Sequence, residues 1–509
     1  MKNDTMKKSL KSRVITVFAV AALLFSACTR DKNERNDFPL IELASDFKVE
    51  KVAEGLTFPT GIAWDSQNAM YVVEAGGGFL EEPPPARIVK IMNGQLTEVV
   101  NLKARGVVAP VVGFTFHNGN FFISHKAADM TGAVSRVSLN GATVTEILKG
   151  FLDGGSEHPL NDLRMGPDGR MYLATGPAGN AAVMGPDVAP FVSRVPSLKT
   201  TSAKELVLLG VNFKSEDFRT PALGDSTMTG AYVPFGTATT PGQRIPATNK
   251  PGGSIVSFDP NNAEGTLQTF AFGLRNTIGL AWNSSGELFA AVNGYDVRGS
   301  RPVRDNFDAT YKITRNTWYG WPDFSANLEP ITDPKFEVAD SSQAMVFLNG
   351  VPQGKNLGFV INHQASGLTP PDRNLVAGLH VFHSSPSMLD VAPASWGDLA
   401  GRLFIAEWGD LTPPTDPKVS RVGYRVVQLN PATKEVTPFI SNKGTLPGSE
   451  QNALGKAIER PFSVRFGPDG AMYIVDYGQV KIDPSRKAQG REPYAYVPNT
   501  GIIWKVTRN

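Results

Sequence analysis

Several residues that can bind anions or move protons lie at nearly matching positions in recurring segments of the chain. They are His158, Arg275 with Asn276 beside it, and Arg460, and they precede the aromatic residues Tyr172, Phe289 and Tyr473 by fourteen, fourteen and thirteen positions. An imidazole can take a proton from a hydroxyl group. Guanidinium groups can hold an anionic, oxygen-rich partner. If the recurring segments converge, these residues predict one pocket that combines proton removal with anion binding.

Two of these residues also have a purely structural interpretation. A histidine in a loop rich in glycine and proline, such as His158, often makes hydrogen bonds that serve stability alone. Arg275 could tie neighbouring loops together through their carbonyl groups. The shared offset favours function, because a structural histidine would not need to match positions in other segments.

The segments that must position these residues follow one repeated pattern. Each has an apolar or aromatic start, a turn containing Gly, Asn or Asp, and an aromatic-led run typical of a β-strand. The pattern recurs at residues 63–73, 116–123, 165–173, 282–289, 401–405 and 466–474. Each copy predicts a hairpin, and a further strand-like run follows it. About six such units with a period of about 50 residues predict an all-β fold, a six-bladed β-propeller.

A pair of β-sandwiches is the alternative fold, and the shared register inside the repeats argues against it. Two long excursions interrupt the period, from Pro177 to Pro251 and from about Tyr319 to His380. Loops of this length inside a compact fold are usually functional or mobile. We therefore expect two long loop excursions over one face of the propeller.

Three motifs resemble the glucose/sorbosone dehydrogenase family. They are Gly273-Leu274-Arg275-Asn276-Thr277-Ile278-Gly279-Leu280-Ala281-Trp282, His158 followed by Gly166-Pro167-Asp168-Gly169, and Tyr319-Gly320-Trp321-Pro322. The resemblance covers most of residues 45–509 and implies a six-bladed sugar dehydrogenase that uses pyrroloquinoline quinone. The segments at 229–236 and 240–243 resemble the L-sorbosone dehydrogenase branch more closely.

The resemblance also implies a role for each candidate residue. His158 would be the general base that takes the hydroxyl proton as hydride leaves the sugar carbon for the quinone. Arg275 and Asn276 would contact the quinone, and Arg460 would hold one of its carboxylates. The walls of the same pocket would include Trp321, His383 and Glu407. Calcium is a second cofactor to consider.

Three positions depart from the family pattern. Pro177 stands where an acidic residue would orient the histidine, so we expect Glu157 or Asp162 to orient it instead. Ile278 replaces a glutamine, and Phe462 replaces the second arginine of a pair. Each change removes a polar contact to the cofactor.

Two other functions fit the same predicted fold. In the first, Glu74, Glu407 and Asp476 supply oxygen ligands to a calcium-like ion, and the protein is a metal-dependent lactonase. These acids each lie three residues after an aromatic residue, a position that turn capping also explains. In the second, the protein is a non-catalytic carbohydrate-binding propeller, because a fold does not fix a function.

The N-terminus predicts export. Five basic residues precede an apolar run from Val14 to Phe25, and Ser26-Ala27-Cys28 follows. This arrangement is typical of a lipoprotein signal peptide over residues 1–27, with Cys28 as the lipidated residue. We expect a flexible tether over residues 28–44 and the propeller over residues 45–509. The protein would then sit in the bacterial cell envelope, facing the periplasm or the cell surface, and touch the membrane only through this anchor.

The composition excludes several partners. A net charge of +2 over 509 residues argues against an electrostatic nucleic-acid binder. A single cysteine leaves no Cys-x-x-Cys-His motif for haem, so the electron acceptor would be a separate carrier. The substrate would be a small sugar.

Overall fold

The computed structural model describes residues 37–77, 84–222, 224–339, 341–411, 421–489 and 493–509. The chain divides into two compact units, Met1–Pro39 and Leu40–Asn509, and only residues 37–39 of the first unit are described. The predicted signal peptide, Cys28 and most of the tether therefore lie outside the described residues. Within the described part, no helix has both the length and the apolar character that a membrane crossing needs.

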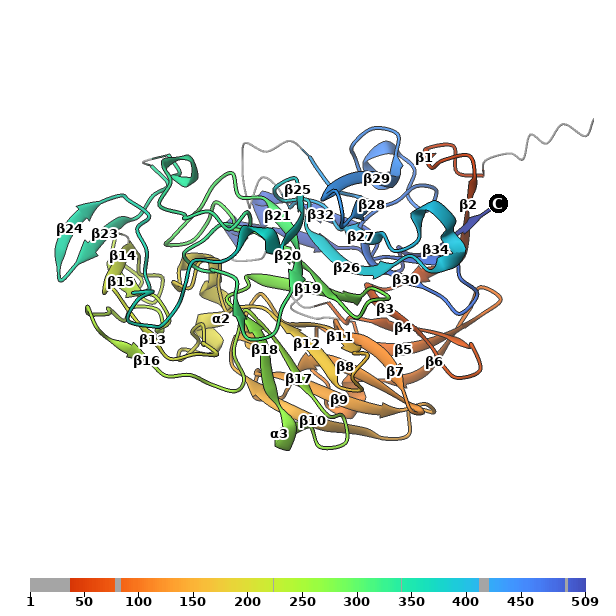
Figure 1. Ribbon diagram of the computed structural model, residues 1–509, viewed down its shortest axis with the longest axis horizontal. Coiled ribbons are helices and arrows are strands. Elements are labelled where there is room, and N and C mark those ends of the chain that lie inside the picture. Colours follow the sequence, from red (N-terminus) through yellow and green to blue (C-terminus); the bar gives the residue numbers. More distant parts are fainter. Residues whose placement is uncertain (1–36, 78–83, 223, 340, 412–420, 490–492) are drawn as a thin grey trace, which may run out of the picture. The chain divides into compact units, whose positions relative to one another are not determined.

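The second unit is a six-bladed β-propeller, and each blade contains a four-stranded antiparallel sheet (Figure 1). From the inner strand outward, blade 1 contains β3 (Pro59–Trp64), β4 (Met70–Glu74), β5 (Arg87–Met92) and β6 (Gln95–Asn101). Blade 2 contains β7 (Phe114–His117), β8 (Asn120–Lys126), β9 (Gly132–Ser138) and β10 (Val144–Phe151). Blade 3 contains β11 (Leu160–Met165), β12 (Met171–Thr175), β17 (Ser254–Phe258) and β18 (Gln268–Phe272).

The remaining blades follow the same order. Blade 4 contains β19 (Asn276–Trp282), β20 (Leu288–Asn293), β21 (Asp308–Ile313) and β25 (Val376–His380). Blade 5 contains β26 (Pro386–Val391), β27 (Leu403–Glu407), β28 (Arg425–Asn430) and β29 (Glu435–Asn442). Blade 6 contains β30 (Pro461–Phe466), β31 (Met472–Asp476), β34 (Gly501–Arg508) and β2 (Phe47–Leu56). The predicted fold class is thus confirmed.

The repeated hairpins share their internal contacts as well as their sequence. In blade 3 the hydroxyl of Tyr172 donates to Asp168 at 2.9 Å, and in blade 6 Tyr473 donates to Asp469 at 2.9 Å. Gly169, at φ 75°, occupies the left-handed turn position that other residues adopt at a cost. The equivalence of these positions, which the sequence repeats predicted, is therefore confirmed by matching contacts in the two blades.

The six inner strands contact one another in a closed ring, β3 to β7, β11, β19, β26, β30 and back to β3. The ring closes in blade 6, where β2 near the N-terminus pairs with β34 at the C-terminus (Figure 1). Closure turns the inner edges of the six sheets toward the axis, where the neighbouring blades protect them. Upstream of β2, β1 (Ile41–Glu42) pairs with β29, so two residues of the expected tether belong to a sheet.

Side chains fill the axis of this ring. Arg465 on β30 donates to both carboxylate oxygens of Asp162 on β11 at 2.8 Å, and these strands belong to blades 6 and 3 on opposite sides of the axis. Nearby, an apolar cluster of inner-strand and loop residues joins blades 2, 4, 5 and 6. It consists of Val112, Ile278 and Met388, with Phe462 packed against them. The axis is thus a packed core with a polar pair inside it.

The two excursions are structured insertions rather than the loops that the sequence predicted. β14 (Val211–Glu216) of the first pairs with β15 (Ser226–Gly230) and with β23 (Met345–Leu348) of the second, and β24 (Val351–Gly354) extends the sheet. We call the part built from both excursions the insertion lobe. Its core includes Phe213, Ile331 and Leu357. The lobe adjoins blade 3, where β22 (Thr317–Trp318) pairs with β18, and it occupies one side of the view in Figure 1.

Short elements complete the fold. They include β13 (Leu206–Val207), β16 (Arg244–Ile245), β32 (Val480–Ile482), β33 (Tyr494–Tyr496), α2 (Ala189–Arg194), α3 (Ala263–Thr266) and several 3-10 helices, among them η3 (Pro186–Val188). The first excursion leaves blade 3 after β12, at the strand end that carries His158. The second begins after β22, where the N–H groups of Tyr319 and Trp321 donate to the carbonyls of Phe272 and Gly273 at 2.9 and 2.8 Å. The beginnings of both excursions therefore reach the end of blade 3 that holds the candidate site.

Candidate functional site

The residues selected by their shared offset all lie where an inner strand begins. His158 precedes β11, Arg275 precedes β19 and Arg460 precedes β30. His383 lies just before β26. Because inner strands of a propeller begin at the same end of the axis, all four positions share one end, which we call the site face.

His158 is held by a backbone carbonyl. Its Nδ1 lies 2.8 Å from the carbonyl oxygen of Pro177. A carbonyl only accepts, so Nδ1 carries the proton and Nε2 has a free lone pair. The side chain is buried, with 7% of the residue exposed. Burial, reinforced by the charges of Arg275 and Arg298, lowers the pKa of His158 well below its usual value, so the imidazole is neutral.

The expected orienting carboxylates are not used. Asp162 pairs with Arg465 and also accepts from the backbone N–H of Leu280 at 3.0 Å. Glu157 lies on the other side of the imidazole, with Oε1 3.7 Å from Nε2 of His158. The prediction that either acid orients the histidine was wrong, because the backbone at Pro177 already occupies Nδ1.

Arg275 lies near His158, and its guanidinium group donates its hydrogen bonds to oxygen atoms of the protein. Its Nη2 donates to Asp296 Oδ2 and to Asn180 Oδ1, both at 2.9 Å. Its Nε donates to the carbonyl of Asn180 at 3.1 Å and its Nη1 to the carbonyl of Asn293 at 3.3 Å. Each guanidinium nitrogen therefore already has a partner, and Arg275 ties the first excursion to blade 4.

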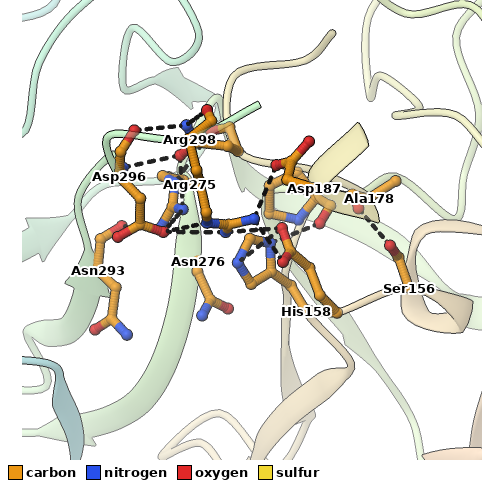
Figure 2. A network of polar contacts seen from close by, with 12 residues as sticks. Ser156, His158, Ala178, Asp187, Arg275, Asn276, Asn293, Asp296 and Arg298 are labelled. Atoms are coloured by element: carbon orange, nitrogen blue, oxygen red, sulfur yellow. Dashed lines mark hydrogen bonds and ion pairs between the residues drawn. The ribbon is translucent and has the colours of Figure 1, made fainter. Parts of the chain in front are cut away.

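Arg298, which sequence reasoning missed, is the centre of the network in Figure 2. Its guanidinium contacts Glu157 Oε2 at 2.8 Å, Asp187 Oδ2 at 2.9 Å and Asp296 Oδ2 at 3.0 Å. Although burial opposes ionisation, Arg275 and Arg298 hold the pKa of Asp296 well below its usual value. Burial raises the pKa of Asp187 to about 6 despite the neighbouring arginine.

Arg298 and its partners lie on loops that the sequence comparison did not consider, because that comparison used only residues before each inner strand. Asp296 and Arg298 follow β20, and Asn180 and Asp187 follow β12. Both loops connect the second and third strands of a blade, and they reach the same site face as the inner-strand starts. Inspection of the residues after each blade's aromatic residue, as well as those before it, would have found Asp296, which lies seven residues after Phe289.

The other predicted contacts lie at the edge of this network. His383 Nδ1 is 3.4 Å from Asp296 Oδ1. Asn276 accepts through Oδ1 from Nδ2 of Asn161 at 3.0 Å. Trp321 is buried in the core of the insertion lobe, and its Nε1 donates to the carbonyl of Asn180 at 3.4 Å. Trp321 therefore supports the residue that binds Arg275.

Arg460 lies in a separate cluster on blades 5 and 6. Its guanidinium stacks between the rings of Trp408 and Tyr424, at 4.3 and 4.9 Å from their centroids. Nη1 donates to the carbonyls of Trp408, Gly409 and Asp410 at 3.0 to 3.4 Å. Its Nε and Nη2 are buried and have no hydrogen-bond partner among the described residues. No hydrogen bond or ion pair between described residues joins Arg460 directly to the network around His158.

Some of the buried polar atoms without a hydrogen-bond partner belong to residues near this end of the axis. Besides those of Arg460, they are Trp408 Nε1, Ser463 Oγ, Thr277 Oγ1 and Asn293 Oδ1, each without a partner among the described residues. A buried donor or acceptor without a partner costs about 1–3 kcal/mol. A ligand or ordered water at this end of the axis could supply the missing partners.

The acids predicted for a metal-dependent lactonase lie apart and have other partners. Glu74 forms an ion pair with Arg87 inside blade 1, and Glu407 pairs with His380 and Arg425. Asp476 accepts from the backbone N–H groups of Glu459 and Arg460 at 2.8 Å. Glu407 is fully buried, and both of its carboxylate oxygens have partners. Among the described residues, no group of three or more His, Cys, Asp or Glu is placed to hold a metal ion.

Comparison with known proteins supports the fold. The chain matches no family model and no curated protein. It is similar to the iodide structure of a Trichoderma reesei carbohydrate-active enzyme of family AA12, with 13% identity, a TM-score of 0.51, and coverage of 93% of this chain and 98% of the other. This likeness supports the propeller architecture.

Two further solved structures are similar at TM-scores below 0.5. The holo pyranose dehydrogenase PQQ domain from Coprinopsis cinerea has 16% identity and a TM-score of 0.49, over 92% of this chain and 97% of the other. The PQQ-bound aldose sugar dehydrogenase from Streptomyces coelicolor has 15% identity and a TM-score of 0.47, over 91% and 99%.

Proposed function

We propose that the protein is an exported sugar dehydrogenase of the aldose or sorbosone type, which transfers hydride from a sugar carbon to pyrroloquinoline quinone. The main support for this proposal is the protonation and hydrogen bonding of His158. Its Nδ1 is bound to the carbonyl of Pro177 and its pKa is lowered, so Nε2 is free to take a hydroxyl proton at neutral pH. A general base alone contributes about 10²–10⁴ in rate, so the reaction needs a hydride acceptor as well.

The residues around Arg460 fit one carboxylate of the quinone. Pyrroloquinoline quinone supplies, when bound, the acceptor for the hydride. Arg460 offers two buried donors, Nε and Nη2, and Trp408 offers Nε1, all without partners among the described residues. Two parallel N–H groups match a carboxylate better than a single charge does. Phe462 and Ile278 of the apolar cluster suit the face of a flat ring better than polar side chains would.

The other predicted cofactor contacts divide into two groups. Asn276 and His383 lie beside His158 and Asp296 and are proposed to contact the quinone or the sugar. Arg275 and Trp321 both donate to Asn180, so we propose that they hold the pocket in shape instead of contacting the cofactor directly.

The cellular setting is proposed from the N-terminal sequence. A lipid on Cys28 would anchor the exported protein to the bacterial envelope, facing the periplasm or the cell surface, with no other membrane contact. A separate carrier would take the electrons, and calcium is proposed to bind together with the quinone.

Reconstitution tests the proposal. Purified protein is mixed with pyrroloquinoline quinone, with and without calcium, and the cofactor absorption band and dye reduction with aldoses or sorbosone are measured. We expect a bound-cofactor band and turnover that depend on the quinone. Opening of a sugar lactone without quinone would instead identify a lactonase, and sugar binding without any turnover would identify a carbohydrate-binding protein.

A further inference from the structure

The imidazole of His158 lies between two oxygen groups of different kinds. The carbonyl oxygen of Pro177 is 2.8 Å from Nδ1, and the carboxylate of Glu157 is 3.7 Å from Nε2. The carbonyl fixes which nitrogen is protonated, because it accepts a hydrogen bond and cannot donate one. The nitrogen that would take the substrate proton therefore faces a carboxylate from the neighbouring residue.

Arg298 fixes the position of that carboxylate. Its Nη2 donates to Glu157 Oε1 at 2.9 Å, and its Nη1 contacts Oε2 at 2.8 Å. This two-point contact holds the plane of the carboxylate as well as its distance. Asp187 and Asp296 hold Arg298 in turn, so the arrangement is fixed from three loops (Figure 2).

The charged groups around His158 favour removal of a proton from it. Burial lowers the pKa of His158, the charges of Arg275 and Arg298 lower it further, and the Pro177 carbonyl and Asp296 oppose this only in part. A proton taken up at Nε2 is therefore held weakly, and a carboxylate oxygen of Glu157 lies 3.7 Å from that nitrogen. The Glu157 side chain is 14% exposed, so water can reach it.

We propose that Glu157 accepts from His158 the proton that the histidine takes from the substrate, with Arg298 as the residue that positions it. The transfer breaks the Nε2–H bond and forms an O–H bond at Oε1, so His158 returns to its neutral state and the proton then passes to water. A movement of about 1 Å brings the two atoms within hydrogen-bond distance. This inference rests on the proposed dehydrogenase function, and Glu157 acts through His158 rather than on the sugar.

A first experiment measures the coupling without cofactor. Hydrogen–deuterium exchange at the imidazole carbon, followed by mass spectrometry, gives the pKa of His158 in the full chain and in Glu157→Gln. An opposite charge within about 4–6 Å shifts a pKa by about one to three units. We expect Glu157→Gln to lower the pKa of His158 by at least one unit. An unchanged His158 would overturn the proposal.

A second experiment measures proton transfer in the enzyme loaded with quinone. We expect Glu157→Gln to lower turnover at least tenfold with little change in KM. Added formate should raise the turnover of this variant several-fold, because a small carboxylate can replace the missing side-chain carboxylate. Glu157→Asp, which keeps the carboxylate, should retain more activity than Glu157→Gln. Wild-type turnover in Glu157→Gln would overturn the proposal.

The two experiments separate failure of this inference from failure of the proposed function. If the wild-type protein oxidises no sugar, the dehydrogenase proposal fails, while the pKa comparison still decides whether Glu157 is coupled to His158. Thermal unfolding of both variants checks that they fold. If Glu157→Gln does not fold, Glu157→Asp supplies the test, because retention of the carboxylate must keep the pKa of His158 near its wild-type value.

Discussion

The Nδ1 atom of His158 lies 2.8 Å from the carbonyl oxygen of Pro177, so a backbone group orients the imidazole where the family resemblance implies a side-chain carboxylate. A carbonyl fixes the tautomer without adding a negative charge. The pKa of His158 therefore stays low, under the influence of burial, Arg275 and Arg298. The base is consequently available at lower pH than a carboxylate-paired histidine would be.

Replacement of the histidine tests its role as a base. We expect His158→Gln to lower the turnover of quinone-dependent sugar oxidation by about 10²–10⁴ while the protein still binds the quinone. Because the pKa of His158 is lowered, the acid limb of the wild-type rate should lie below pH 6.5. His117→Gln, on β7 at the opposite strand end, is the matched control. Full activity in His158→Gln would contradict the assignment.

The histidine also depends on a glycine that packs against it. A Cβ atom on Gly176 would lie 2.4 Å from His158 Cβ and 2.9 Å from Asn276 Oδ1, which are distances too short for any side chain. We expect Gly176→Ala to move His158 and to lower activity at least tenfold. Gly179→Ala is the control, because its nearest neighbour would be Met184 Sδ at 3.7 Å. Activity assays and thermal unfolding of both variants make the comparison.

Asp153 makes stability depend on pH. Burial raises the pKa of this carboxyl to about 7, in spite of hydrogen bonds from Thr201 and from the N–H of Ala178. The folded state thus binds a proton that the unfolded state releases above about pH 4. The stability from this group is complete below that pH and is lost as the pH rises to about 7.

The variant Asp153→Asn isolates this contribution. Between pH 4 and pH 7, the free energy of unfolding of the wild type should fall relative to the variant, by at most about 1.4 kcal/mol per pH unit. Denaturant unfolding at pH 4.5, 6 and 8 measures the difference. A difference that does not vary with pH would show that the carboxyl does not titrate in this range.

The repeats made the propeller and part of the site predictable from sequence. Hairpins with an Asp-Gly turn and a following tyrosine recur with the same contacts, so the offset placed His158, Arg275 and Arg460 at the same strand end. Repetition supplies this information because equivalent positions in a closed ring face a common axis.

The sequence repeats could not predict two features, the insertion lobe and the group that orients His158. The insertion lobe does not repeat, and the pairing of β14 with β23 that joins its two halves spans more than a hundred residues of sequence. The orienting group of His158 is a main-chain carbonyl, and side-chain identity at Pro177 carries no signal for it. Arg298 was missed for a related reason, since it lies on a loop between the second and third strands of its blade.

The ion pair across the axis should be important for stability. Arg465 is buried and forms an ion pair with Asp162, so Arg465→Met leaves a buried carboxylate without its charged partner. Removing one member of a buried pair costs about 3–5 kcal/mol. We expect the double variant Asp162→Asn with Arg465→Met to recover part of this loss. Arg244→Met, which breaks an exposed pair with Glu205, should cost less than about 1 kcal/mol.

Arg460 provides a test of the cofactor that does not depend on turnover. Its Nε and Nη2 have no partner among the described residues, so a bound carboxylate would satisfy both. We expect Arg460→Lys to weaken the binding of pyrroloquinoline quinone at least tenfold, because an ammonium group cannot reproduce two parallel donors. Titration of the cofactor absorption band measures the Kd, and the exposed Arg244→Lys is the control. Equal affinity in Arg460→Lys and wild type would mean that the unsatisfied donors of Arg460 serve a different ligand.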